Sequence, residues 1–313
     1  MAWLLGAAGG ADAAASRPVL ERAGLVPLAV VFLLQSCAAT TSPTLEELRN
    51  ARISSIPGGP ISLRDGVYEG PSSPPGSVSR RRVTLWTRPV AFGDLASVRG
   101  ENAVALLSIS EGGSGSVVHV GVFQKRSGRV ADVGMAPVGD RVEARALSIV
   151  DGTIVLDVVE AGAGDAMCCP GQLARKSYAF RDGALTLVSS SVTGRLSLAA
   201  LADGEWTLVS LDGQPLPQAA RSPTAGFEGT RVSGFGGCNR YFGQVVEKSP
   251  GAIVVGPLAG TKMACPSPAM EVEDRFLSAM SQVTRYSFVG GHLVLSGVDR
   301  GTSRELTFER GAR

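Results

Sequence analysis

The chain carries little net charge and few side chains of the kinds that most often act in catalysis. Among its 313 residues, 30 Lys and Arg face 28 Asp and Glu, so the formal net charge is only +2. Such a balance gives no electrostatic reason to expect nucleic acid or a polybasic contact with a membrane. The two histidines, His119 and His292, lie in an alternating strand pattern and in a turn, which favours structural or solvated roles. No cofactor is indicated.

Long hydrophobic runs are also missing beyond the N-terminus. The apolar run Leu25–Leu34 has 10 residues, whereas a transmembrane helix needs about 20. It follows Arg17 and Arg22, and a positive segment before a short apolar core is typical of a secretion signal. We therefore predict that residues 1–36 are a signal peptide.

The signal peptide ends in Leu34-Gln35-Ser36-Cys37, which resembles the lipobox of bacterial lipoproteins. In that family the cysteine becomes the N-terminus and carries acyl chains that hold the protein at a membrane. Residues 37–43 are small and polar, like a lipoprotein tether. The alternative is a plain signal peptide with a chance cysteine. The resemblance implies lipidation of Cys37 and a place in the cell envelope, at the periplasmic face of the outer membrane or at the cell surface.

Four cysteines remain after the leader, and export to an oxidising compartment favours disulfides over metal binding. Cys168 and Cys169 are adjacent, so their Cα atoms lie only about 3.8 Å apart, below the usual disulfide span. For this pair we expect either a vicinal disulfide or two free thiols, with a bridge to another module as a third option.

Residues 44–195 are predicted to form a β-rich module of unknown function. Short β-branched runs recur with Asp-Gly pairs between them, which predicts an antiparallel sandwich or barrel. Thr44, with Glu47 three residues later, predicts a short capped helix at its start. Asp157, Glu160 and Asp165 lie close in sequence, but we expect a solvated strand end rather than an acid–base pair.

A second module, residues 198–310, is predicted to be a small antiparallel sheet or barrel packed with one helix. Ser267 is expected to cap this helix, with Pro268 in its first turn. The apolar stripe of the helix repeats at helical spacing and comprises Val272, Phe276, Ala279, Met280 and Val283. The fold class is therefore α+β and mostly antiparallel β.

The second module resembles the META domain, also called HslJ-like, of bacterial envelope proteins. The resemblance rests on ordered motifs, "GEWTLVS", "VSGFGGCNRYFG", "GPLAGTKMAC", a helix glutamate and "LVLSG". It implies a compact α+β barrel, an envelope location and an association with stress or antibiotic tolerance, without a known reaction. The motif positions that match are Trp206, Gly234, Gly237, Asn239, Thr261, Met263 and Glu273.

The first module more weakly resembles the β-rich region that precedes META in some bacterial lipoproteins, which often carries a calcium-type loop. Gly93, Asp94, Gly100 and Ala103 match that loop, but its asparagine and later aspartates are replaced. A calcium site needs about 6–8 oxygen ligands, and Asp94 and Glu101 do not supply them. We interpret the segment as a turn that has lost its ion, with a calcium-dependent module as the alternative.

The glycine-rich segment 233–243 matches neither a P-loop nor a dinucleotide loop. A nucleophilic Cys238 needs a base such as His292 within reach. The plainer interpretation is a Cys238–Cys265 disulfide, closing a loop of about 27 residues and stabilising by about 3–4 kcal/mol; two buried thiols are the remaining option. Asn239 is expected to serve the turn, because asparagine tolerates the left-handed region.

The sequence therefore favours a lipid-anchored, two-module envelope protein without enzymatic activity. Its expected partners are the membrane, through the acyl chains, and an envelope protein or peptide, but not nucleic acid. The alternatives are an envelope thiol enzyme that uses Cys238 and a calcium-dependent β module. The sequence does not indicate the oligomeric state.

Overall fold

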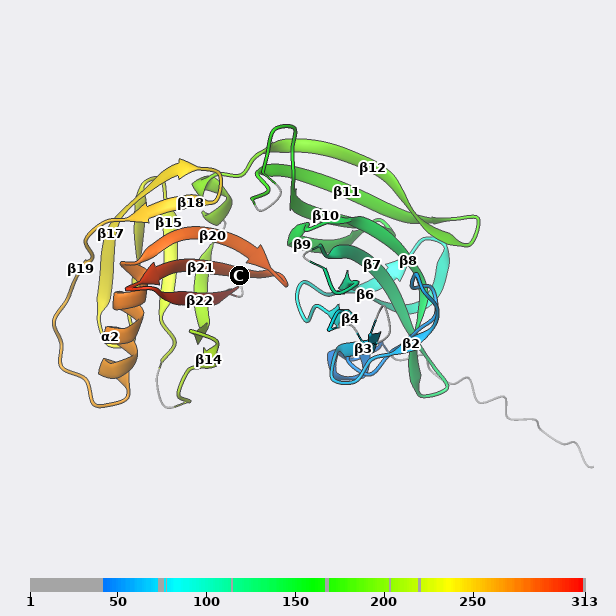
Figure 1. Ribbon diagram of the computed structural model, residues 1–313, viewed down its shortest axis with the longest axis horizontal. Helices are drawn as coiled ribbons and strands as arrows, with labels where there is room; N and C mark the ends of the chain where they lie inside the picture. The colour runs from blue at the N-terminus through cyan, green and yellow to red at the C-terminus, as the bar shows by residue number, and fades with distance from the viewer. Residues whose placement is uncertain are drawn as a thin grey trace, which may run out of the picture. The chain divides into compact units, whose positions relative to one another are not determined.

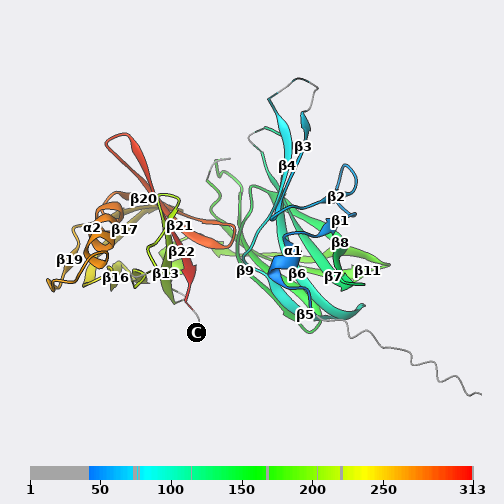
Figure 2. The same ribbon diagram turned by 90° about the horizontal axis from the view of Figure 1, so that it is seen from below.

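The computed structural model describes residues 42–72, 76, 78–113, 115–166, 169–202, 204–218 and 221–311. The predicted signal peptide, the predicted lipidation site Cys37 and most of the predicted tether lie outside these residues. Residues 40–313 form one compact unit, whose strands belong to two consecutive modules (Figures 1 and 2). Among the described residues, no helix is long and apolar enough to cross a membrane.

The chain enters the first module through the short helix α1, Leu45–Leu48. The Thr44 hydroxyl accepts the backbone N–H of Glu47, and the Glu47 carboxylate accepts the backbone N–H of Thr44. This reciprocal capping box satisfies two backbone donors at the helix start. The predicted helix and its cap are confirmed.

The first module is a nearly closed barrel of mostly antiparallel strands, in which β1 pairs with β8 in parallel. Its larger sheet has the order β2-β1-β8-β7-β6-β4-β3, with β5 paired to β6. The strands are β1 Arg52–Ile53, β2 Ile61–Ser62, β3 Val67–Ser72, β4 Arg80–Leu85, β5 Ala91–Leu95, β6 Val98–Ser110, β7 Val117–Arg126 and β8 Arg129–Asp140.

A four-stranded sheet with the order β12-β11-β10-β9 completes this module. Its strands are β9 Glu143–Val150, β10 Thr153–Glu160, β11 Gln172–Arg181 and β12 Ala184–Arg195. One apolar core fills the space between the two sheets, around Leu106, Val120 and Tyr178. A second core lies on the other face of the larger sheet, around Leu48, Leu107 and Phe123. Because β6 and β7 contribute to both cores, they read as nearly continuous apolar runs.

The second module is a closed eight-stranded barrel. Its ring runs β13-β15-β16-β17-β18-β20-β21-β22 and closes by pairing β22 with β13. The short helix η1, Leu198–Leu201, precedes it. The strands are β13 Glu205–Leu211, β14 Gln214–Pro215, β15 Thr224–Glu228, β16 Arg231–Phe235, β17 Arg240–Ser249, β18 Ala252–Val255, β19 Ala259–Gly260, β20 Val283–Val289, β21 His292–Asp299 and β22 Thr302–Arg310.

Helix α2, Ala269–Met280, packs its apolar stripe into this barrel (Figure 1). The Phe276 ring lies in the core between Tyr241 and Phe308, with ring centroids 5.4 and 6.4 Å away. The predicted cap was wrong: the N-cap is Pro268, and the Ser267 hydroxyl donates to the Glu271 carboxylate instead of a backbone group. The helix therefore begins one residue later than the sequence predicted.

Asp-Gly pairs form tight hairpin turns, as predicted. At Asp151-Gly152 and Asp182-Gly183 both residues have positive φ, 48° and 71° in the first pair and 51° and 80° in the second. Two consecutive positive values are typical of a type I′ turn, whose twist matches that of the flanking strands. These turns fix the register of β9 with β10 and of β11 with β12.

Candidate functional site

A disulfide joins Cys238, between β16 and β17, to Cys265, before α2. The Cα atoms lie 5.9 Å apart and the bridge spans 27 residues. The structure thus contains the bridge favoured by the sequence. With its sulfur bonded to Cys265, Cys238 has no thiolate to act as a nucleophile, so the structure argues against the thiol-enzyme alternative.

Asn239 is the centre of a hydrogen-bond network that ties this loop to the segment before α2. Its Oδ1 accepts the Thr261 hydroxyl at 2.8 Å and the Met263 backbone N–H at 2.7 Å. Its Nδ2 donates to the Met263 carbonyl at 3.1 Å and to the Glu273 carboxylate at 2.9 Å. Asn239 does not have positive φ, so the predicted left-handed geometry was wrong. The side chain holds distant segments together instead of shaping its own turn.

Glu273 brings a buried carboxylate from helix α2 to the same loop. Its side chain is only 5% exposed, and one oxygen accepts the backbone N–H groups of Cys238, at 3.0 Å, and Asn239. No Lys or Arg among the described residues forms an ion pair with it. Backbone and amide donors stabilise the carboxylate here, since hydrogen bonds to a charged group are stronger than neutral ones.

Two glycines of the loop are required by this packing. A Cβ on Gly234 would lie 2.1 Å from the Thr224 carbonyl oxygen. Gly237 has φ of +131°, a region that other residues rarely adopt, and a Cβ there would lie 3.1 Å from the Ala269 carbonyl. The backbone can therefore approach β15 and α2 only where side chains are absent.

A cavity of about 490 Å³ opens beside the disulfide. Its wall includes the disulfide cysteine Cys238, the Phe235 ring, and Met263, which is 59% exposed. The Arg221 guanidinium lies over the Phe235 ring at 4.4 Å, and Arg240 also lines the cavity. Glu205, Thr224 and Thr261 line it as well, so its wall combines apolar side chains with polar and charged groups, as binding pockets commonly do.

Comparison with known proteins identifies this part of the chain. Residues 199–311 match the family of the META domain. The second module is a META domain. An NMR structure of a protein from Burkholderia xenovorans shares 28% identity and covers 38% of this chain and 90% of its own, with a TM-score of 0.30. A second NMR structure shares 24% identity and covers 37% of this chain and 95% of its own, with a TM-score of 0.31. The comparison with curated proteins found no match.

The structure separates the expected motif residues of the META domain into two groups. Gly234, Gly237, Asn239, Thr261, Met263 and Glu273 meet around the disulfide. Trp206 lies elsewhere: its Nε1 donates to the Leu201 carbonyl at 2.9 Å, and its ring contacts Phe288 at 6.1 Å. Trp206 therefore anchors η1 to the barrel and has no part in the pocket.

Sequence reasoning missed the pocket residues Arg221, Phe235 and Arg240. Phe235 and Arg240 lie inside the motif "VSGFGGCNRYFG", but a motif match does not say which of its side chains line a pocket. Arg221 lies before β15, outside every motif, and nothing in the sequence predicts that it stacks on Phe235.

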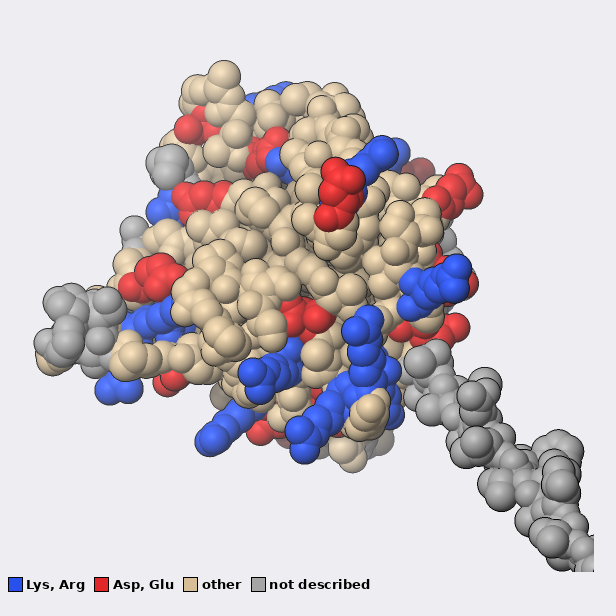
Figure 3. Space-filling model, turned by 90° about the vertical axis from the view of Figure 1, so that its right-hand side faces the viewer, with Lys and Arg blue, Asp and Glu red and all other residues tan. Residues whose placement is uncertain are grey.

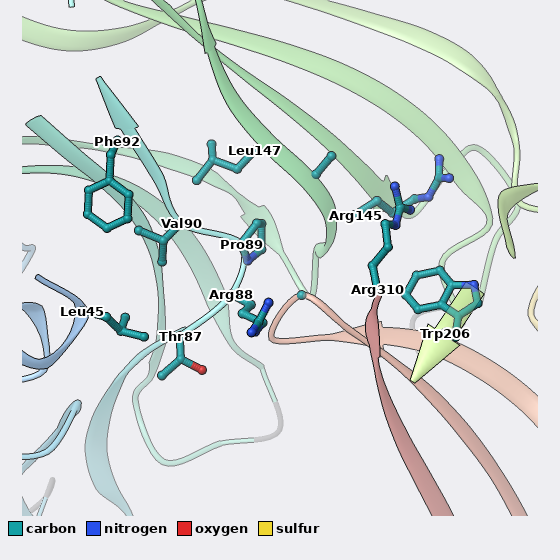
Figure 4. A pocket seen from close by; sticks show the side chains of 12 residues that line it. Leu45, Thr87, Arg88, Pro89, Val90, Phe92, Arg145, Leu147, Trp206 and Arg310 are labelled. Carbon is teal, nitrogen blue, oxygen red and sulfur yellow. The ribbon is translucent and has the colours of Figure 1, made fainter. Parts of the chain in front are cut away.

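A second pocket, of about 430 Å³, is lined by residues of both modules. Figure 4 shows Trp206 and Arg310 of the META domain, with Arg88, Val90 and other residues of the first module. Nearby, the Glu143 carboxylate on β9 accepts the backbone N–H of Phe288 at 2.7 Å. Burial raises the pKa of Glu143 to about 7, against the opposing effects of that bond and of Arg285.

The remaining candidates have structural roles in the described part of the chain. Burial lowers the pKa of both histidines; the Nδ1 of His292 contacts the Gly290 carbonyl on the β20–β21 hairpin. The three carboxylates weighed as an acid–base group bind different cations: Asp157 binds Arg175, Glu160 binds Lys176 and Asp165 binds Arg195. Arg195 is the largest cause of the low pKa of Asp165, about 2.

The calcium-type segment of the first module is held by an amide. The fully buried Asn102 donates its Nδ2 to the carbonyls of Gly93, Val98 and Gly100, at 3.3, 3.4 and 2.7 Å, and its Oδ1 accepts from Gln124 at 3.1 Å. The carbonyls therefore converge on an amide group. Among the described residues, no group of three or more His, Cys, Asp or Glu side chains is placed to hold a metal ion. Cys168, of the predicted vicinal pair with Cys169, lies outside the described residues.

Proposed function

We propose that this chain is a lipid-anchored protein of the bacterial cell envelope. Its META domain binds an envelope protein or peptide, in a binding or structural role linked to stress tolerance, and does not act as an enzyme. The Cys238–Cys265 disulfide carries the proposal, because such bonds persist in oxidising compartments and are rare in the cytosol. An exported, disulfide-bonded protein also agrees with the leader, which ends in the lipobox-like sequence at Cys37.

The pocket beside the disulfide supports binding over catalysis. The cysteine in its wall is oxidised to a disulfide. The carboxylate behind it, Glu273, accepts hydrogen bonds from a backbone N–H and a side-chain amide. Phe235 and Met263 offer apolar surface, while Arg221 and Arg240 offer guanidinium donors. This combination suits a peptide segment that carries an apolar side chain and a carboxylate, since Arg recognises carboxylates by paired hydrogen bonds.

Fractionation of cells that express the full chain tests the anchor. The wild-type protein is expected in the membrane fraction, with acyl mass on a new N-terminal Cys37. A Cys37→Ala variant is expected to lose that mass, while the neighbouring Ala39→Ser variant keeps it. An unacylated wild-type protein would contradict the anchor.

Cross-linking in native envelope tests the binding role. Phe235→Ala and Met263→Ala are expected to reduce the capture of a specific cross-linked partner. The control is Phe242→Ala, which removes a 49% exposed ring from β17 that does not line this pocket. Equal capture by the pocket variants and the control would refute the pocket as the binding site.

A further inference from the structure

Four arginines form an exposed group at one end of the first module. Arg126 and Arg129 are register partners at the β7–β8 hairpin. Arg52 and Arg129 line the same hollow, and Arg52 pairs in register with Ala131 on β8. The Arg99 carbonyl accepts the Gln124 side chain at 2.7 Å, which places the start of β6 at the same end. We call Arg52, Arg99, Arg126 and Arg129 the basic end.

Three carboxylates at this end accept hydrogen bonds from other groups, and Asp94 on β5 lies beside the start of β6 as well. Glu47 pairs with Lys125, and Asp132 accepts the backbone N–H groups of Ser54 and Ser55. Glu101 accepts the Ser42 hydroxyl at 2.6 Å. None of the four arginines has a carboxylate within ion-pair distance among the residues that the structure describes.

Figure 3 shows Lys and Arg side chains gathered over the lower part of this side of the molecule. The arginines of the basic end are all exposed. Arg126 donates two hydrogen bonds to the Gln124 amide oxygen, at 2.7 and 3.2 Å. No ion pair within the described part of the chain therefore neutralises the guanidinium groups of the basic end.

The chain enters the module at this same end. The Ser42 contact with Glu101 places the first described residue beside β6, two positions from Arg99. Four residues lie between Cys37 and Ser42, and the five steps from one Cα to the next span at most about 18 Å. An acyl anchor on Cys37 would therefore keep the basic end close to the bilayer surface.

We propose that the basic end lies against the anionic phospholipid headgroups of the membrane that holds the acyl chains. The inference rests on the proposed lipid anchor. Each Lys or Arg close to an anionic surface favours the bound state by about five-fold, and the attraction decays within a Debye length of about 8–10 Å. The contact orients the first module on the membrane and turns its opposite end away from it.

Arginine-selective labelling of the acylated full-length protein in vesicles tests this contact. Phenylglyoxal modifies exposed guanidinium groups, and peptide mass spectrometry gives the labelling rate of each one. In vesicles of phosphatidylcholine with about one third phosphatidylglycerol, the four arginines are expected to label at least about five-fold more slowly than in phosphatidylcholine alone. High salt is expected to abolish the protection, and Arg275 on α2 serves as the internal control.

Paired variants connect the protection to charge. The double variant Arg126→Gln/Arg129→Gln is expected to reduce the protection of Arg52 and Arg99. The control is the double variant Lys248→Gln/Arg275→Gln, at exposed positions on β17 and α2, which is expected to leave that protection unchanged. Equal labelling in both lipid mixtures by an acylated protein would overturn this inference alone. A protein without acyl chains would overturn the proposed anchor, and with it the short tether required here.

Discussion

The two modules each organise a glycine-rich turn around a buried asparagine, but over different distances along the chain. In the first module, Asn102 bonds carbonyls at positions 93, 98 and 100, within nine residues. In the META domain, Asn239 bonds Thr261, Met263 and Glu273, 22 to 34 residues away. A disulfide reinforces the second arrangement. One asparagine shapes a local loop, whereas the other fastens a barrel to its helix.

This difference has a consequence for stability. A local turn is supported by the strands on either side of it, here β5 and β6, which pair with each other. The META clasp, which we define as Cys238, Asn239, Cys265 and Glu273, joins the loop before β17 to helix α2 and to the segment before it. Among the described residues, the only strand pairing between these segments is the two-residue β17–β19 pairing. We therefore expect damage to the clasp to loosen α2 from the barrel, and damage at Asn102 to stay within its hairpin.

The largest effect is expected from Asn239→Ala. The substitution leaves the Met263 N–H, the Met263 carbonyl and the Glu273 carboxylate short of partners, and should lower the free energy of unfolding by about 3–5 kcal/mol. Chemical denaturation measures the loss, and amide hydrogen exchange locates it in α2 and the segment before it. Asn239→Asp keeps the shape but places a second carboxylate beside Glu273, so wild-type stability in that variant would contradict the network.

Removal of the disulfide by Cys238→Ala with Cys265→Ala should cost slightly less. Closing a loop of about 27 residues in the unfolded chain contributes about 3–4 kcal/mol. Thermal unfolding of the variant, compared with the wild-type protein with and without a reductant, measures this contribution. A reductant should lower the unfolding temperature of the wild-type protein and leave the META domain of the double variant unaffected; unchanged stability in the variant would show that the bridge is dispensable.

Asn102→Ala should have a smaller and more local effect, about 2–3 kcal/mol, because neutral hydrogen bonds to carbonyls are lost. Hydrogen exchange should increase in residues 91–104 and not in the META domain. The comparison of the two asparagines would fail if this variant loosened α2 as much as Asn239→Ala does. Addition of calcium should stabilise neither the wild-type protein nor the variant, as thermal unfolding in calcium and in chelator can show.

The last effect concerns pH at Glu143. Its pKa is about 7 in the folded protein and 4.5 in the unfolded chain, so between these values the folded state holds the additional proton. The stabilising contribution is complete below about pH 4.5 and is lost as pH rises to about 7. The unfolding temperature of the wild-type protein, relative to Glu143→Gln, should therefore fall from pH 5 to pH 8. A constant difference between the two proteins would contradict the raised pKa.

The sequence predicted much of the fold because its signals are local. Asp-Gly pairs define the hairpins, and the Thr44 cap requires only Glu47, three residues away. Helix α2 was recognised from its apolar stripe, but its start was misplaced because Ser267 bonds a side chain and not the backbone. The fold class and the META domain were predicted correctly.

The candidate site was less predictable, because its geometry depends on contacts between distant segments. The motif marked Asn239 and Glu273, but not that they bond each other. Trp206 belongs to the same motif set yet lies apart from the site. No local sequence pattern marks Arg221, which lies over the Phe235 ring, or the arginines of the basic end.

Peptide mapping of the unreduced protein, isolated from the envelope, tests the central claim most directly. We expect an acylated N-terminal Cys37 and a peptide pair linked through Cys238 and Cys265, with no alkylation of Cys238 before reduction. A free, alkylatable Cys238 in the native protein, or an N-terminus without acyl chains, would contradict this account.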